Sequence, residues 1–259
     1  MHLLSRFQRW SIGIYIGDSP FTLRNPANIP NPVLTANDVS DLNAQFVADP
    51  FIIRRGESWY MLFEALDAIS GRGKIACARS YDGIAWSYDR IVLEEPFHLS
   101  YPYVFAWQDC VYMVPESYQA NAVRLYRANE FPGRWELVGE LLTGRPFLDS
   151  SLLYHGSQWW LFSADSLRND RLRLYFAERV EGPWQEHPKS PLVESNAHLA
   201  RPGGRLLEYQ GRLFRFAQDD FKGYGRHVWA MEITRLNATD YSEHPYPAEP
   251  LLRRSGCSL

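Results

Sequence analysis

The chain has 259 residues, of which 46% are hydrophobic and 22% charged, the composition of a globular protein with a core of its own. A formal net charge of −3 argues against a nucleic-acid partner, because such partners require a basic face. The three cysteines, Cys77, Cys110 and Cys257, make no even disulfide framework and favour a reducing, cytoplasmic location. No apolar run approaches the ~18 residues of a membrane span.

The first predicted element lies at the N-terminus, MHLLSRFQRWSIGIYIGD, where basic residues precede a short apolar patch. No small-residue cleavage site follows, so the patch predicts a strand rather than a signal peptide. Residues 10–35 continue with strand-like segments and turn residues but contain no hairpin. We therefore expect outer strands of a sheet in this region.

Four hairpins follow along the chain, each an apolar strand, a short turn and an aromatic-rich strand. They span residues 49–65, 101–117, 149–165 and 201–219. Their first residues are Asp49, Tyr101, Asp149 and Arg201, which are 52, 48 and 52 residues apart. Each of the first three hairpins is followed by a third strand and then by a tryptophan, Trp86, Trp135 or Trp184, at steps of 49 residues.

A period of about 50 residues with three or four short strands per copy is typical of a β-propeller. A lone four-stranded sheet leaves both faces wet, and radial stacking of several sheets buries them. We therefore predict an all-β, five-bladed β-propeller in a single domain, 1–259. Its successive blades are expected at 46–97, 98–147, 148–197 and 198–245.

The fifth blade is expected to be incomplete at the C-terminus. Residues 10–35 would supply its outer strands, while from Pro245 on only PYPAEPLLRRSGCSL remains, which is too short for an inner hairpin. An unpaired sheet edge is a template for pairing with another strand. We accordingly expect a truncated form of a longer design, whose fifth blade is completed by a second copy or by a partner domain.

The polar residues at the rim of the predicted blades predict a site. The innermost strand of each blade lines the central channel, so its first residue and the last residue of the next strand lie at one rim. The first residues of the inner strands are Asp49, Tyr101, Asp149 and Arg201. The last residues of the second strands are Glu64, Glu116, Ala164 and Gln218. Three further polar residues, His98, His198 and Asp219, lie next to these positions. Packing alone would tend to repeat one residue type, so this variety predicts a binding or catalytic site.

Each of these residues also has a structural interpretation, which we keep open. An Asp before a Pro caps turns. Glu64 and Glu116 can form structural ion pairs with Arg201 or Arg215, and the two histidines can hydrogen-bond to the backbone.

Ala48-Asp49-Pro50, followed by a Gly turn and Trp59-Tyr60, resembles the first-blade motif of glycoside hydrolase family 43, in which the Asp is the general base. Leu148-Asp149-Ser150, which precedes His155-Gly156 and Trp159-Trp160, is similar to the third-blade motif, in which the Asp tunes the acid. This resemblance implies a five-bladed fold and hydrolysis of a glycoside.

The same resemblance implies a general-acid Glu in the inner strand of the next repeat, where this chain has Arg201-Pro-Gly-Gly. Either Glu64 or Glu116 is then the proton donor, or the hydrolase mechanism is lost. The two alternatives lead to different functions.

A closer resemblance covers most of the chain. It consists of the motifs ADPF, EPFHLSYPYVF, VPES, LLTGRPFLD, WWLF, GPW, RPGG and FAQD. These motifs resemble the N-terminal propeller domain of glucosamine inositolphosphorylceramide transferases and its bacterial relatives. The resemblance implies a carbohydrate context, in glycolipid or polysaccharide synthesis.

Two functions follow for a carbohydrate ligand, with no metal and no cofactor. In a hydrolase, Asp49 activates water, Asp149 orients, and Glu116 or Glu64 protonates the leaving group. Substrate would be held by Arg201, His98, Tyr101, His198, Gln218 and Asp219. We expect the hydrolase, which the retained Asp49 and Asp149 favour. The alternative is a non-catalytic glycan-binding or accessory module that works with a glycosyl- or formyltransferase, and the replacement of the acid by Arg201 favours it.

Overall fold

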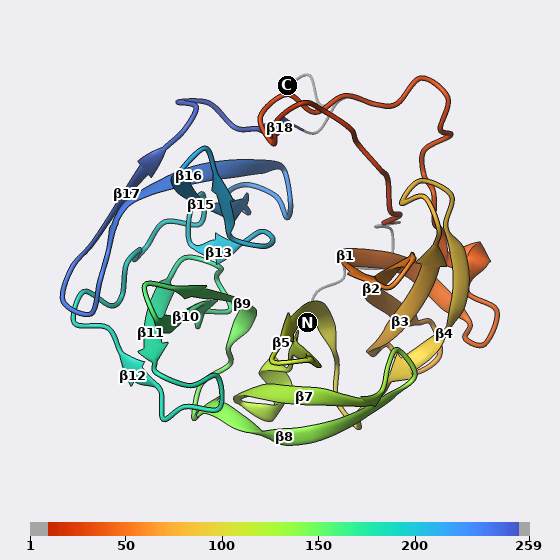
Figure 1. Cartoon of the computed structure of the whole chain (residues 1–259), viewed down its shortest axis with the longest axis horizontal. Helices are drawn as coiled ribbons and strands as arrows, with labels where there is room; N and C mark the ends of the chain where they lie inside the picture. Colours follow the sequence, from red (N-terminus) through yellow and green to blue (C-terminus); the bar gives the residue numbers. More distant parts are fainter. Residues whose placement is uncertain (1–9, 254–259) are drawn as a thin grey trace. The chain divides into compact units, whose positions relative to one another are not determined.

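The computed structural model describes residues 10–253, and Figure 1 shows their strands in the colours of the chain order. Residues 1–9 of the expected N-terminal strand and the residue Cys257 lie outside the described residues, and the rest of that segment forms isolated bridges at Ile12 and Ile16 rather than a strand. The chain divides into two compact units, residues up to Met113 together with Tyr126–Leu137, and Val114–Leu125 together with Val138 onward. Besides strands, the described chain contains the short 3-10 helices η2 (Ala36–Asp38) and η3 (Tyr118–Ala120).

The first unit contains an antiparallel sheet with the order β1-β2-β3-β4. Its strands are β1 (Ala44–Arg55), β2 (Ser58–Asp67), β3 (Gly73–Ser80) and β4 (Ser87–Leu93). Ile12 and Leu34 pack with Met61, Phe63 and Ala76 in one buried cluster, so the N-terminal segment covers this sheet.

The boundary between the two units runs through the second sheet, with the order β5-β6-β7-β8. Its strands are β5 (Ser100–Trp107), β6 (Cys110–Glu116), β7 (Ala122–Glu130) and β8 (Arg134–Thr143). Glu116, the last residue of β6, belongs to the second unit.

The second unit contains two further sheets. One has the order β12-β11-β10-β9, from β9 (Leu148–His155), β10 (Gln158–Ala164), β11 (Leu172–Ala177) and β12 (Gln185–Glu186). The other has the order β13-β15-β16-β17, and in addition β14 pairs with β15 and β18 with β16. Its strands are β13 (Arg201–Pro202), β14 (Leu207–Tyr209), β15 (Arg212–Asp219), β16 (His227–Leu236), β17 (Tyr241–Pro245) and β18 (Leu252–Arg253). Trp160 and Phe162 of the β9–β12 sheet pack with Leu213 and Ile233 of this sheet in one core.

The four hairpins lie where the repeat predicts them, and their turns explain why. Gln108 and Asp109 in the β5–β6 turn both have positive φ, as do Gly156 and Ser157 in the β9–β10 turn. Positive φ at both central residues defines the type I′ turn, whose twist matches that of the flanking strands. These turns fix the register of the β5–β6 and β9–β10 hairpins and therefore the positions of Tyr101 and Asp149.

The expected number of five blades is wrong, because the described chain forms four sheets. Residues 10–35 form only the isolated bridges Ile12–Leu34 and Ile16–Arg24. After Pro245, β18 pairs with β16 of the fourth sheet. Of the segments expected to build a fifth blade, residues 10–35 pack on the first sheet and β18 adds to the fourth.

The recurring tryptophans share a local role. The indole N–H of Trp86 donates to Gly83 O at 3.2 Å, that of Trp135 to Pro132 O at 2.8 Å, and that of Trp184 to Val180 O at 3.1 Å. Each ring therefore closes the turn before the outer strand, and its polar N–H is satisfied.

Candidate functional site

The first residues of three repeats share an unusual backbone conformation. Asp49, Tyr101 and Asp149 have φ values of 53°, 44° and 48°. This left-handed region is sparsely occupied by residues other than glycine, and less by Tyr than by Asp. Such conformations cost free energy and cluster at functional sites.

A β-bulge accompanies two of these residues. Asp149–Ser150 of β9 together face Ser163 of β10, and Asp49–Pro50 of β1 together face Phe63 of β2. Two residues opposite one bend the strand and redirect a side chain. The repeat thus places an aspartate on a bulge in each of these two hairpins.

In the second unit, Arg201 donates to three polar side chains. Its Nε donates to Asp149 Oδ2 at 2.6 Å, its Nη2 to Glu116 Oε2 at 3.3 Å and its Nη1 to Asn169 Oδ1 at 3.2 Å. Arg201 is 8% exposed and Asp149 only 1%. We call Glu116, Asp149, Arg201 and Gln218 the arginine cluster.

The two carboxylate oxygens of Asp149 differ. Oδ2 also accepts a hydrogen bond from Gln218 Nε2 at 2.6 Å, and the same Nε2 donates to Pro202 O at 2.9 Å. Oδ1 is buried and accepts no hydrogen bond from any residue between 10 and 253. The backbone N–H of Asp149 donates to Glu116 Oε2 at 3.1 Å, and Arg201 donates to both carboxylates. A buried carboxylate oxygen without a donor is costly, and a ligand hydroxyl would satisfy it.

The electrostatics of the cluster keep Arg201 charged. Burial disfavours the charged guanidinium, but the attraction of Asp149, with smaller contributions from Tyr224 and Glu116, outweighs it and raises the pKa of Arg201 well above its ordinary value. Two carboxylates against one guanidinium leave the three groups one negative charge in excess.

Asp219, at the end of β15, anchors the loop beside the cluster. Its Oδ2 lies 2.9 Å from His198 Nδ1 and accepts from Trp229 Nε1 at 3.2 Å, and its Oδ1 accepts from Phe221 N at 3.1 Å. The predicted residues His198 and Asp219 therefore do meet.

The next residue, Asp220, is also directed inward. Its Oδ1 accepts from Gly225 N at 2.8 Å, and its Oδ2 is buried without a hydrogen-bond partner in the described chain. Burial raises the pKa of Asp220, and the charges of Arg201 and Asp149 act on this carboxyl as well. Tyr224 of the same loop lies with its ring 5.2 Å from the guanidinium carbon of Arg201.

In the first unit, Glu64 and His98 form a second pair. His98 Nε2 lies 3.3 Å from Glu64 Oε1, and His98 Nδ1 accepts a hydrogen bond from Gly73 N at 2.9 Å. Because Nδ1 is an acceptor, Nε2 carries the proton that faces Glu64. Both ring nitrogens are thus engaged, which orients the ring as a structural pair does.

The other two predicted residues of the first unit have different surroundings. Tyr101 is buried and packs edge-on against Phe51, with ring centroids 4.8 Å apart. Asp49 is half-buried on its bulge. That the residues of both units line a single cavity stays a prediction.

Sequence reasoning missed Asn169, Asp220 and Tyr224. Asn169 and Tyr224 lie in loops without periodic pattern, and only Gly223 and Gly225 around the tyrosine marked a special conformation. Asp220 directly follows the predicted Asp219.

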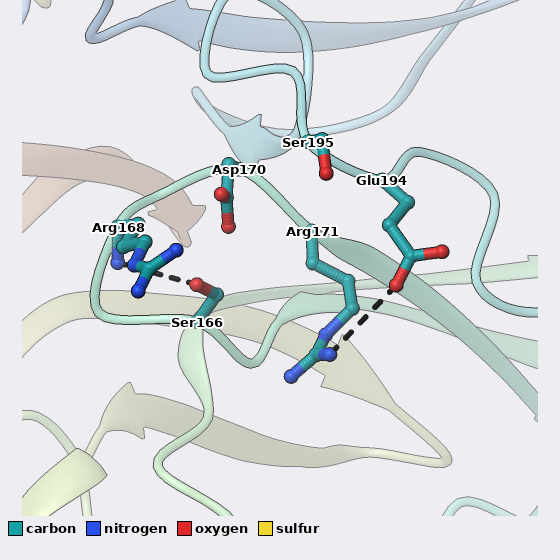
Figure 2. A pocket seen from close by; sticks show the side chains of 6 residues that line it. All are labelled: Ser166, Arg168, Asp170, Arg171, Glu194 and Ser195. Carbon is teal, nitrogen blue, oxygen red and sulfur yellow. Dashed lines mark hydrogen bonds and ion pairs between the residues drawn. The ribbon is translucent and has the colours of Figure 1, made fainter.

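A polar pocket of about 260 Å³ lies on the loop that carries Asn169, and Figure 2 shows its side chains. It is lined by Ser166, Arg168, Asp170, Arg171, Glu194 and Ser195. Arg171 Nη1 lies 3.9 Å from Glu194, and Arg171 Nε donates to the buried Asp165 at 2.6 Å. Two guanidinium groups and two carboxylates line the pocket, so their formal charges balance.

Among the described residues, no group of three or more His, Cys, Asp or Glu side chains is arranged to hold a metal ion. The described part of the chain also has no helix with the length and apolarity needed to cross a bilayer.

Comparisons of sequence give one family. The family model "Glucosamine inositolphosphorylceramide transferase 1, N-terminal" matches residues 7–251. The protein named glucosamine inositolphosphorylceramide transferase 1 in Oryza sativa subsp. japonica is 38% identical over 257 residues, 91% of this chain and 34% of that protein. The protein of the same name in Arabidopsis thaliana is 34% identical over 268 residues, which are 95% of this chain and 35% of that protein. The chain spans about a third of the length of these relatives.

Comparisons of structure give the fold. An exo-beta-1,3-galactanase from Clostridium thermocellum has a TM-score of 0.69 at 13% identity, and the match covers 86% of this chain and 52% of the galactanase chain. A GH43 protein from Bacillus licheniformis has a TM-score of 0.62 at 18% identity, and the match covers 85% of this chain and 48% of that protein. At such identities the likeness shows the fold alone, an all-β propeller, as the sequence predicts. The resemblance to the N-terminal propeller domain of the transferases is confirmed, and the resemblance to glycoside hydrolase family 43 is confirmed for the propeller fold.

Proposed function

Since the chain belongs to the family of N-terminal regions of glucosamine inositolphosphorylceramide transferase 1, we propose that it is a carbohydrate-recognition module that binds a sugar for a transferase without hydrolysing it. The ligand class is a sugar or the sugar-bearing head group of a lipid, as the name of the relatives suggests. The arginine cluster is the proposed binding site.

One observation carries this proposal: the ion pairing of Arg201 with both Asp149 and Glu116. A general acid must hold a proton that it can give to the leaving group. Glu116 Oε2 instead accepts hydrogen bonds from the Asp149 N–H and the Arg201 guanidinium, donors that favour the ionised carboxylate. This arrangement supports recognition and opposes hydrolysis.

The cluster has the hydrogen-bonding capacity for a sugar. A sugar hydroxyl both donates and accepts, so a site needs both kinds of group. Asp149 Oδ1 is an acceptor without a described donor. Arg201 has five N–H groups, of which three donate to Asp149, Glu116 and Asn169.

A second candidate is a glycoside hydrolase with a changed proton donor. Two observations favour it, the fold shared with the galactanase and the aspartates Asp49 and Asp149 on equivalent bulges. In this mechanism Asp49 activates water, Asp149 orients and tunes the acid, and Glu64 or Glu116 supplies the proton.

The purified chain tests the two candidates in one set of measurements. We expect it to bind glycans on an array while leaving nitrophenyl glycosides intact over long incubation. Turnover of any nitrophenyl glycoside that is lost in Asp49→Asn would establish the hydrolase instead, because removal of a general base costs about 10²–10⁴ in rate. Neither binding nor turnover would refute both.

The variant Asp149→Asn connects binding to the arginine cluster. Asparagine keeps the shape of the side chain but removes the charge that faces Arg201. We expect weaker glycan binding by this variant and unchanged binding by Asp170→Asn, whose carboxyl lines the polar pocket of Figure 2. Equal loss in both would show that the sugar binds elsewhere.

A further inference from the structure

The loop Asp219–Arg226, between β15 and β16, carries two exposed aromatic rings. Phe221 is 46% exposed and Tyr224 is 39% exposed. Two aromatic rings within four residues of a loop are unusual for an ordinary solvent-exposed turn, where small and polar residues predominate. The loop starts at a predicted site residue and adjoins the arginine cluster through Tyr224.

Each ring lies against polar or charged side chains. The Phe221 ring lies 4.4 Å from that of His198 at an interplanar angle of 37°, and Lys222 Nζ lies 5.3 Å from its centroid. The Tyr224 ring lies 5.2 Å from the guanidinium carbon of Arg201. The rings are therefore held in place by contacts while a large part of each stays open to solvent.

The loop is pre-organised by hydrogen bonds to two consecutive aspartates. Asp219 accepts from Phe221 N at 3.1 Å, and Asp220 accepts from Gly225 N at 2.8 Å. Lys222 and Gly225 adopt the left-handed conformation, with φ of 58° and 62°. A loop that is already held in its binding conformation lowers the entropic cost of binding a ligand.

Two buried carboxylate oxygens lie in the same region without hydrogen-bond donors. They are Oδ2 of Asp220 and Oδ1 of Asp149, and no residue between 10 and 253 donates to either. Asp220 interacts electrostatically with both Arg201 and Asp149, so the loop and the cluster share one electrostatic environment. Asp220 and the two open rings belong to one loop, and a polar acceptor together with aromatic faces matches the two sides of a sugar, its hydroxyl groups and its apolar C–H face.

We infer that the loop Asp219–Arg226 is a sugar-stacking platform, in which Phe221 and Tyr224 receive the C–H face of a pyranose ring while Asp220 accepts hydrogen bonds from its hydroxyl groups. This inference rests on the proposed function and adds to it the part of the site that selects a pyranose. The aromatic rings contribute apolar contact area, and Asp220 makes the interaction depend on the orientation of the hydroxyls.

The test measures binding of methyl pyranosides of gluco, galacto and manno configuration to the whole chain by saturation-transfer and titration NMR. Phe221→Ala and Tyr224→Ala are each expected to weaken the Kd by about tenfold. Phe221→Tyr keeps a ring and is expected to stay within about threefold of the parent. Tyr154→Ala is the matched control, since Tyr154 is 43% exposed at the far end of β9 from Asp149.

Asp220→Asn separates a binding role from a structural one. Its Oδ1 still accepts from Gly225 N, whereas the acceptor at Oδ2 is replaced by a donor. We expect weaker pyranoside binding together with unfolding stability that is equal to or greater than that of the parent. Loss of both binding and stability would mean that Asp220 only supports the fold of the loop, and would overturn its role as an acceptor.

The outcomes for the inference and for the proposed function differ. If the parent chain binds a methyl pyranoside and Phe221→Ala and Tyr224→Ala bind it equally well, the platform is refuted and the proposed function stands. If the parent binds none of the pyranosides and no glycan on the array, the proposed function falls and the platform falls with it. Thermal unfolding of each variant, compared with the Tyr154→Ala control, establishes that a loss of binding occurs in a folded chain.

Discussion

Asp149 and Arg201 stand 52 residues apart, one repeat of the chain, and are joined by a hydrogen bond of 2.6 Å between Oδ2 and Nε. The same register in consecutive repeats thus carries the two partners of a buried ion pair. Because Glu116 shares the guanidinium, removal of Arg201 leaves two neighbouring carboxylates buried without their counter-ion.

The first prediction concerns stability. Arg201→Met should lower the free energy of unfolding by about 3–5 kcal/mol, because an uncompensated buried charge is expensive. Urea titration followed by tryptophan fluorescence measures it. Arg168→Met is the control, since Arg168 is exposed at the polar pocket and is expected to change stability by less than about 0.5 kcal/mol. A loss below about 1 kcal/mol in Arg201→Met would show that the carboxylates find other donors.

The second prediction uses the raised pKa of Asp220. Burial raises it above the ordinary 3.8, so the folded state binds the proton more tightly than the unfolded state. The contribution of Asp220 to stability is therefore most favourable below about pH 3.8 and declines as the pH rises through the raised pKa.

Asp220→Asn removes this contribution to the pH dependence. The variant should gain stability relative to the parent as the pH rises above 3.8, and the difference should level off above the raised pKa. Urea titrations at a series of pH values give the difference directly. A gain for the variant that grows as the pH falls would have the wrong sign and would contradict the assignment.

The hairpins and the position of the site residues could be predicted because the information is local. Alternating strands and turn residues fix each hairpin, and the 52-residue and 48-residue steps place Asp49, Tyr101 and Asp149 in one register. Their common left-handed backbone shows that the register was meaningful. The pairing of Arg201 with Glu116 is one of several ion pairs that the sequence leaves open, and its pairing with Asp149 is not predicted, since sequence does not say which partners meet.

The rest depended on contacts that no pattern encodes. The closing segment 10–35 resembles outer strands, but Ile12 and Leu34 bury themselves against the β1–β4 sheet, so no fifth sheet forms in the described chain. Asn169 and Tyr224 reach Arg201 from loops whose sequences have no period. Association with a second copy or a partner domain, and a cytoplasmic location, stay predictions.

The third prediction concerns Gly73, at the start of β3. A Cβ at this position would lie 2.2 Å from Leu99 O and 2.7 Å from Glu64 Oε1, so the backbone must shift. Gly73→Ala should lower the free energy of unfolding by about 3 kcal/mol, at the upper end of the range for overpacked sites. Gly139→Ala, where a Cβ meets nothing within 4 Å, should have little effect. Equal stability of the two variants would mean that the Glu64–His98 region relaxes freely.

The last prediction concerns a buried pair that lies outside the proposed site. Arg215 of β15 donates from Nε to Glu243 Oε2 at 2.6 Å and from Nη2 to Oε1 at 2.5 Å, and the Tyr241 hydroxyl donates to the same carboxylate at 2.6 Å. Burial disfavours the charged form of Arg215, but Glu243 outweighs it and raises the pKa of Arg215 above its ordinary value. Arg215 therefore stays charged in the folded chain.

A double-mutant cycle measures the coupling of this pair. Arg215→Leu and Glu243→Leu should each lower the free energy of unfolding by about 3–5 kcal/mol, because each leaves one charge buried without its partner. The double variant Arg215→Leu/Glu243→Leu should lose much less than the sum of the two, because no charge is then left unpaired. Additive losses, within about 0.5 kcal/mol, would show that the two side chains act independently.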